Sequence, residues 1–334
     1  MLRFVLRRLA LLVPILFGLS LLLFLWVRRL PGGPATALLG EKATPEAVAR
    51  INKLYGFDQP ITTQYVLYMK RLLTGDFGVS IITQQPVLEE FLRRFPATVE
   101  LSVTALLFAI GLGIPMGYLA ARHYGRWPDQ LAVVGSLIGV SIPVFFLAFI
   151  LKYLFAVEWG LLPSDGRQDT SIRATHVTNF YVLDGMLTRE WDASWDAILH
   201  LVLPGIALGT IPLAIIVRMT RASVLEVLNE DYVRTAHAKG LDASTVRTRH
   251  ILRNAMLPVA TTIGLQMGLL LAGAVLTETV FAFNGVGLFL RDAIFQLDYP
   301  VLQGFILFIA VIYAVINLVV DISYGILDPR VRVS

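Results

Sequence analysis

Six long apolar stretches constrain this chain more than any other feature of its sequence. A bilayer core is about 30 Å thick, so a helix needs about 20 apolar residues to cross it. Of the 334 residues, 56% are hydrophobic and only 16% are charged, whereas soluble domains carry about 25% charged residues. We therefore predict an all-α integral membrane protein with six transmembrane helices, at roughly Leu9–Val27, Leu101–Ala121, Leu131–Phe155, Leu199–Val217, Pro258–Phe283 and Val301–Val320.

The connectors between these stretches alternate in charge. The chain ends, the connector with Arg122 and Arg126, and the connector 231–258 are basic, whereas the connector 157–197 is rich in Asp and Glu. Lys and Arg accumulate on the cytoplasmic side of membrane proteins, so both termini and 231–258 are expected in the cytoplasm. The first stretch is longer than the apolar region of a signal peptide, so we expect it to remain as a span.

The chain divides into a first span, an external segment and a longer remainder that contains the other spans. We expect residues 1–30 to form the N-terminus and first span, 31–98 an extracytoplasmic helical segment, 99–325 the transmembrane domain, and 326–334 a cytoplasmic tail. The connectors 157–197 and 219–257 are the external loop and the cytoplasmic segment of that domain.

Proline and glycine residues divide the external segment into three predicted short helices. Thr44 precedes Pro45 as an N-cap precedes a proline in the first turn, and Gly56 ends that helix. A second helix is predicted over 60–73, and a third over 86–95, where Pro96 stops it. These helices either cover the outer mouth of a pathway, dock a partner, or lie among lipid headgroups.

The connector 231–258, DYVRTAHAKGLDASTVRTRHILRNAMLP, reads as two helices with a hinge. Gly240 follows the first helix as a C′ residue, and Asp242 is suited to cap the second, which runs from Ala243 to Met256. Tyr232, Ala236 and Gly240 share one stripe. This pattern favours docking of a cytoplasmic partner over a helix that only binds headgroups. The candidate partner-docking residues are Tyr232, Arg234, Ala236, Lys239, Gly240, Leu241 and Asp242.

Common catalytic and nucleotide-binding motifs are missing from the sequence. No lysine follows a glycine, so the G-x-x-x-x-G-K-[ST] phosphate loop is absent, and neither H-E-x-x-H nor G-x-S-x-G occurs. We expect no enzyme activity, no metal site and no cofactor bound by this chain. Its basic residues lie beside apolar spans, so nucleic acid is not an expected partner.

Few polar residues lie in the apolar stretches. A proton-coupled carrier would place carboxylates near the bilayer midplane, and the sequence has none there, which argues against this class of transporter. The candidate pathway or gating residues are Gln266, Met267, Leu270 and Glu278. For Glu278, an equally good reading is a residue at the outer end of its span that bonds to the next loop.

The motif DYVRTAHAKGL…RHILRNAMLP resembles the cytoplasmic loop of binding-protein-dependent ABC importer permeases, in particular the B-type subunit of the dipeptide/oligopeptide permease family. The segments LYGFDQPITTQYVLYMKRLLTGDFGVS, TETVFAFNGVG and DISYGILDPRVR resemble other parts of that family in the same order. Where the general loop motif begins Glu-Ala-Ala, this chain has Arg234, Thr235 and Ala236, as the peptide branch does. The family's motif positions correspond first to Ala236, Gly240 and Pro258 of this chain.

The resemblance implies a type I permease architecture in a prokaryotic cytoplasmic membrane. It implies a second, homologous permease as partner in a heterodimer, two ATP-binding subunits or domains that hold ATP and Mg, and an extracytoplasmic substrate-binding protein. It further implies import of dipeptides or oligopeptides, coupled through 231–256; nickel chelates, haem or another small solute remain alternatives. A secondary transporter driven by an ion gradient, or a receptor without transport, are the other classes left open.

Overall fold

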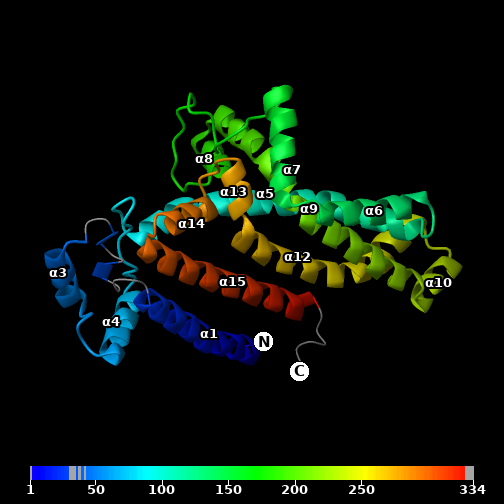
Figure 1. Cartoon of the computed structure of the whole chain (residues 1–334). Coiled ribbons are helices and arrows are strands. Elements are labelled where there is room, and N and C mark those ends of the chain that lie inside the picture. The colour runs from blue at the N-terminus through cyan, green and yellow to red at the C-terminus, as the bar shows by residue number, and fades with distance from the viewer. Residues whose placement is uncertain (1, 30–34, 37–38, 41–42, 328–334) are drawn as a thin grey trace.

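The chain folds into a bundle of long helices, described by a computed structural model for residues 2–29, 35–36, 39–40 and 43–327. These residues contain helices and no strand. Figure 1 shows the long helices lying alongside one another, with α3 and α4 at one end and α10 at the opposite end. The all-α fold class is therefore confirmed.

Within the described residues, five helices are long and apolar enough to cross a membrane, or six if one bent pair is a single span. This agrees with the number of spans predicted from the sequence. The five are contained in α1 (Leu2–Arg28), α5 (Val87–Arg122), α9 (Trp191–Leu228), the continuous helix from Ala243 that includes α12 (Arg253–Gly273), and α15 (Tyr299–Leu327).

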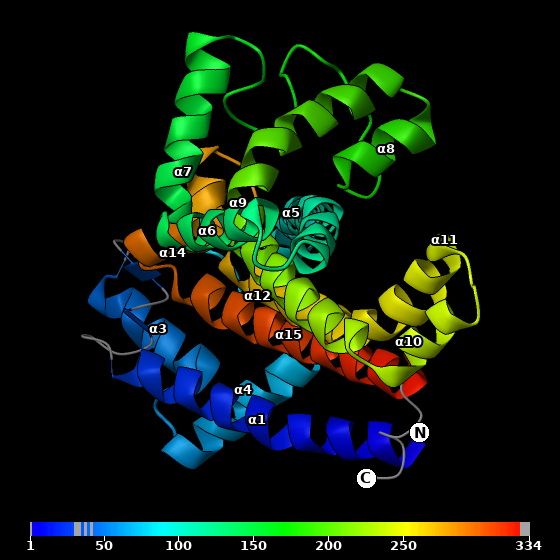
Figure 2. The ribbon, with the colours of Figure 1, turned by 90° about the vertical axis from the view of Figure 1, so that its right-hand side faces the viewer.

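The third predicted span is divided into two helices. The first part is α6 (Trp127–Ser141), and the second is α7 (Val144–Leu151), which continues as the π-helix η2 (Lys152–Glu158). The two parts are bent by 98°, and α7 stands away from the long helices in both views (Figures 1 and 2). The residue before a proline is disfavoured in the helical region; Ile142, which precedes Pro143, is extended at φ −82° and ψ 122°. The sequence predicted a span here without predicting this break.

The first two short helices of the external segment form as predicted. They are α3 (Pro45–Tyr55) and α4 (Ile61–Leu73). The hydroxyl of Thr44 accepts a hydrogen bond from the backbone N–H of Ala47 at 3.2 Å, and Gly56 ends α3 with a φ of 68°. Local capping chemistry therefore sets the bounds of α3.

The third predicted helix of this segment was wrong. Pro96 does not stop it; α5 continues through Pro96 for 36 residues, to Arg122. Proline removes one backbone donor and usually breaks a helix. Here Ala97 and Leu101, directly after it, are fully buried in the main apolar cluster of the bundle, so tertiary packing holds the helix together. The expected boundary at residue 98 therefore falls inside a helix.

Small residues bring α5 and α9 into close contact. A Cβ atom added to Gly209 would lie 2.7 Å from the carbonyl oxygen of Ala105, and one added to Gly117 would lie 2.6 Å from the Cβ of Thr220. Such distances are too short for any side chain, so these glycines allow the two backbones to approach. Larger side chains around them, including Leu101 and Leu203, complete the core.

The remaining helices connect the long ones. They are α8 (Tyr181–Thr188), α10 (Asp231–Ala238), α11 (Ala243–Thr245), the π-helix η3 (Val246–Leu252), α13 (Val275–Val280) and α14 (Val286–Phe295). The loop that contains α8 is fixed to α5 by a buried ion pair between Arg167 and Glu100 at 2.7 Å. Glu100 also accepts a hydrogen bond from the backbone N–H of Val182. The loop 157–197 is thus tied to α5.

Candidate coupling segment and pathway

The segment 231–252 is a helical hairpin at one end of the bundle, far from α3 (Figures 1 and 2). Its first arm is α10, and its second arm, α11 with η3, continues without interruption into α12. The predicted second helix of 243–256 is therefore the beginning of the fifth span. A displacement of the hairpin is applied directly to the end of a transmembrane helix.

Gly240 makes the turn between the two arms. The backbone N–H of Leu241 donates to the carbonyl of Ala236 at 3.2 Å, and the N–H of Gly240 donates to the carbonyl of His237 at 3.0 Å. This pair of bonds is the Schellman motif, which requires a left-handed residue at C′. Gly240 supplies it with a φ of 71°, as predicted.

Asp242 caps the second arm. Its carboxylate accepts hydrogen bonds from the backbone N–H groups of Ser244 at 2.9 Å and Thr245 at 3.0 Å, and from the Thr245 hydroxyl at 2.7 Å. These bonds, with the Thr245 hydroxyl first, hold the pKa of Asp242 below its ordinary value. Because the folded-state pKa is the lower one, the cap contributes fully above the unfolded pKa of about 3.9. Its contribution is lost as the pH falls through the folded-state pKa.

Removing this cap should loosen the second arm. In Asp242→Ala, the amides of Ser244 and Thr245 lose their acceptor, so we expect faster hydrogen exchange there, measured by mass spectrometry on the purified chain at neutral pH. Asp242→Asn should change the exchange less, since asparagine also caps helices. Asp231→Ala is the matched control, because Asp231 is also exposed and its carboxylate pairs with exposed Arg234, at 3.5 Å. Unchanged exchange in Asp242→Ala would contradict the role of the cap.

One face of α10 packs against the bundle. Val233 is 2% exposed and Ala236 is 4% exposed, and they share an apolar cluster with Ala121, Val224 and Ile251. Ala236 therefore packs the hairpin against the rest of the chain and does not lie on the surface that a partner would contact. The cluster also places the connector after α5 beside the hairpin, so the two basic connectors lie at the same end.

The other face of the hairpin is exposed and basic. Tyr232 and Leu241 are 39% and 40% exposed, and the Tyr232 hydroxyl accepts a hydrogen bond from the side-chain amide of Asn254 at 2.9 Å. This bond joins the first arm to the first turn of α12. Six of the seven predicted docking residues lie on the exposed surface: Tyr232, Arg234, Lys239, Gly240, Leu241 and Asp242.

The candidate pathway residues are in two places. Gln266, Met267 and Leu270 lie on α12, which packs between α9 and α15; Gln266 and Leu270 are buried, and Met267 is half-buried. Glu278 lies on α13, beyond the end of α12. A common role for all four in a pathway stays a prediction.

Glu278 bonds to two other helices. Its carboxylate accepts hydrogen bonds from the hydroxyl of Thr98 at 2.6 Å and from the backbone N–H of Leu288 at 2.8 Å. The Thr98 hydroxyl in turn accepts a hydrogen bond from the N–H of Val286 at 2.9 Å. Gly285, the N-cap of α14, has no side chain to cap it, so Thr98 and Glu278 supply the missing acceptors.

Several residues that pair with partners far away in the sequence were not predicted from the sequence alone. Thr98 is 180 positions from Glu278. The ion pair between Arg221 on α9 and Asp129 on α6 joins residues 92 positions apart. No local pattern marks such pairs. For metals, the described residues contain no group of three or more His, Asp or Glu side chains that could hold an ion.

The comparisons with known proteins cover nearly the whole chain. Residues 113–333 match the family model "Binding-protein-dependent transport system inner membrane component", and residues 1–102 match the model of the N-terminal part of such components. The dipeptide transport system permease protein DppB of Alkalihalophilus pseudofirmus is 46% identical over 332 residues, which cover 99% of this chain and 100% of that protein. DppB of Escherichia coli K12 is 47% identical over 336 residues, with 99% of both chains covered.

A solved structure is similar in fold. The MetNI methionine ABC transporter in an inward-facing conformation matches with a TM-score of 0.54 and 15% sequence identity, covering 72% of this chain and 97% of that one. With its apolar helices, the chain is a multi-pass protein of the inner membrane. It belongs to the family of binding-protein-dependent transport system inner membrane components.

Proposed function

We propose that this chain is the transmembrane permease subunit of an ATP-driven ABC importer for dipeptides and oligopeptides. The substrate class rests on relatives that are 46–47% identical over 99% of this chain and carry the name dipeptide transport system permease. The chain itself makes no bond in substrate and hydrolyses no ATP.

The observation that carries the mechanism is the hairpin 231–252 and its continuity with α12. Its exposed basic face fits a partner with acidic groups, and its packed face fixes it to the bundle through Val233 and Ala236. When ATP binding closes two partner ATPases, the hairpin moves as a rigid body, and the packed helices reorient from inward-facing to outward-facing.

The proposed assembly has further parts. The termini and the hairpin lie in the cytoplasm, where two ATP-binding subunits hold ATP and Mg. A second, homologous permease completes the pathway as a heterodimer, and an extracytoplasmic binding protein delivers the peptide. The observation favouring this orientation is that the basic connector after Arg122 and the basic hairpin lie at one end of the bundle.

Reconstitution tests the energy source. The complex that co-purifies with this chain is placed in liposomes with ATP trapped on the ATPase side, and uptake of a labelled dipeptide is measured. We expect uptake that depends on ATP and on added binding protein. An ion gradient without ATP should drive none.

Three outcomes separate the classes of function. Uptake by the isolated chain with an ion gradient alone would identify a secondary transporter. Binding of a cytoplasmic partner without uptake of any solute would identify a receptor. ATP-dependent uptake of a nickel chelate or haem, with no uptake of dipeptides, would keep the mechanism and overturn the substrate.

A further inference from the structure

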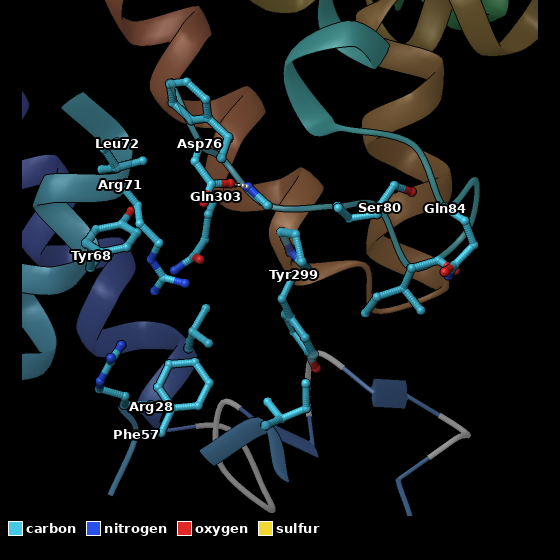
Figure 3. Close-up of a pocket in the computed structure, with 18 residues that line it drawn as sticks. Arg28, Phe57, Tyr68, Arg71, Leu72, Asp76, Ser80, Gln84, Tyr299 and Gln303 are labelled. Carbon is cyan, nitrogen blue, oxygen red and sulfur yellow. Dashed lines mark hydrogen bonds between the residues drawn. The ribbon is translucent and has the colours of Figure 1, made fainter. Parts of the chain in front are cut away.

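A cavity of about 200 Å³ lies at the end of the first span, away from the hairpin. Its wall comes from the end of α1, from α3 and α4, from the loop that follows α4, and from the start of α15. Figure 3 shows Arg28, Tyr68, Arg71, Tyr299 and Gln303 arranged around this space. A single water needs only about 10–15 Å³ of such volume, so the cavity has room for a polyatomic group.

Arg28 is held in place at the cavity wall. Its Nε donates a hydrogen bond to the side-chain oxygen of Gln64 at 2.8 Å, and one Nη donates to the carbonyl of Phe24 at 3.1 Å. The guanidinium also lies over the Phe24 ring, 3.3 Å from its centroid. A guanidinium has five N–H donors in a fixed plane, and these two bonds use two of them. The head group is therefore oriented before any ligand arrives.

Arg71 and Tyr68 bring further donors to the same space. Arg71 lies close enough to Arg28 for the two cations to repel each other, and in Figure 3 its guanidinium points into the cavity. The hydroxyl oxygen of Tyr68 is buried and has no hydrogen-bond partner among the residues that the structure describes. Burial raises the pKa of Tyr68 to about 12, with Tyr65 acting in the same direction and the two arginines opposing it. The phenol is thus a neutral donor at neutral pH.

The charge of the cavity is positive. Among its lining residues two arginines face one carboxylate, that of Asp76, and one oxygen of this carboxylate already accepts a hydrogen bond from the N–H of Gly78 at 3.0 Å. A buried hydroxyl that lacks a partner within the described part of the chain carries a free-energy cost, and so does the repulsion between two neighbouring guanidiniums. An oxyanion would offset both, because it accepts hydrogen bonds and carries negative charge.

The position of the cavity indicates the source of that anion. Leu22 and Leu25, on the same end of α1, are 62% and 43% exposed, as lipid-facing residues are. Trp26 is 38% exposed and contacts Tyr299, a cavity residue, edge to face at 5.9 Å between ring centroids. Exposed Trp and Tyr mark the level of the lipid headgroups, so the arginines lie at the level of lipid phosphates.

We infer that this cavity binds the phosphoryl group of an anionic phospholipid, held by Arg28, Arg71 and the hydroxyl of Tyr68. Planar guanidiniums match the geometry of phosphate oxygens. The bound lipid would bridge α1 and α4 beside the start of α15, and so add to the contacts that fix the segment 31–98 to the bundle.

Lipid binding to the purified, delipidated full-length chain in a neutral detergent tests this inference. The probe is a short-chain phosphatidylglycerol, and the readout is its dissociation constant by calorimetry. We expect Arg28→Gln and Arg71→Gln to weaken binding roughly tenfold, and Tyr68→Phe about threefold. Arg28→Lys should fall between wild type and Arg28→Gln, because it keeps the charge and loses the planar geometry.

Each cavity arginine has a matched control next to it in the chain. Arg29→Gln and Lys70→Gln remove one positive charge from exposed neighbours that do not line the cavity, so they should leave binding unchanged. Gel filtration and the melting temperature verify that every variant is folded. Equal losses in the control variants would indicate diffuse surface charge and overturn the site.

Competition identifies the chemical group and its source. Inorganic phosphate should displace the lipid only at much higher concentration, since it lacks the acyl chains. Phosphate that binds while the lipid does not would reject the lipid as source. Displacement by the dipeptide Ala-Ala but not by phosphate would assign the cavity to a carboxylate. Wild-type affinity in folded Arg28→Gln and Arg71→Gln would overturn the inference altogether.

Discussion

Gly240→Trp should abolish transport and uncouple ATP hydrolysis from substrate while leaving the chain folded in the membrane. A Cβ atom at Gly240 would meet nothing within 4 Å, so the isolated chain has room for the indole. The positive φ of 71° adds strain of about 1–2 kcal/mol, which a packed bundle tolerates. The indole would project from the exposed face of the hairpin, where we place the ATPase. Peptide uptake and peptide-stimulated ATPase activity in proteoliposomes are the measurements.

Gly240→Asn is the matched control for this variant. Asparagine adopts the left-handed conformation more readily than other residues with side chains, and it adds far less bulk. We expect this variant to keep most of the transport, which separates obstruction of a partner from distortion of the Schellman turn. Full transport by Gly240→Trp would refute docking at this face.

Glu278→Ala should destabilise the chain more than a surface substitution does. The change leaves the partly buried N–H of Leu288 without its acceptor, and an unsatisfied buried donor costs roughly 1–3 kcal/mol as an upper range. It also removes a side-chain acceptor from the first turn of α14, and it leaves a void, since Glu278 is fully buried. We expect a melting temperature several degrees lower, measured on the purified chain.

Two further variants decide between a structural and a gating role for Glu278. Glu278→Gln keeps the size and one carbonyl acceptor, so it should lose less stability than the alanine variant and retain transport. Glu89→Ala, an exposed acid in the first turn of α5, should leave the melting temperature unchanged. A stable Glu278→Gln that no longer transports peptide would favour the pathway role over the capping role.

The features predicted best from the sequence are those that neighbouring residues decide. Thr44 and Asp242 cap their helices, and Gly56 and Gly240 end theirs, as expected. In each case the acceptor, the donor and the permitted φ all lie within a few residues of one another. The number of spans was also predictable, because length and apolarity alone set it.

The two prolines show where such reasoning fails. Pro96 lies inside a continuous helix, whereas Pro143 begins a new one after a bend of 98°. The local chemistry of the two is the same. The difference is that the residues after Pro96 are buried against α9, whereas α7 after Pro143 exposes Phe145, Phe146 and Phe149. Burial depends on the whole fold, so the local sequence does not determine it.

Among the site residues, too, local features could be predicted from the sequence and features that depend on the whole fold could not. The exposed face of the hairpin could be predicted because it lies in one stretch, although the inward position of Ala236 could not. The capping of α14 by Thr98 and Glu278, and the cavity between Arg28 and Arg71, depend on residues that are distant in sequence and adjacent only after folding. The residue types at these positions do not indicate a role until the positions of the helices are known.

The uninterrupted course of α5 has a consequence for signalling across the membrane. With 36 residues it is roughly 54 Å long; its first turns pack beside α14, and its last residues pack beside the hairpin. A helix of this kind behaves as a stiff rod. In the orientation that we propose, a tilt imposed outside, when a delivery protein binds, would be transmitted directly to the cytoplasmic end, and a tilt imposed by nucleotide binding would be transmitted outward in the same way.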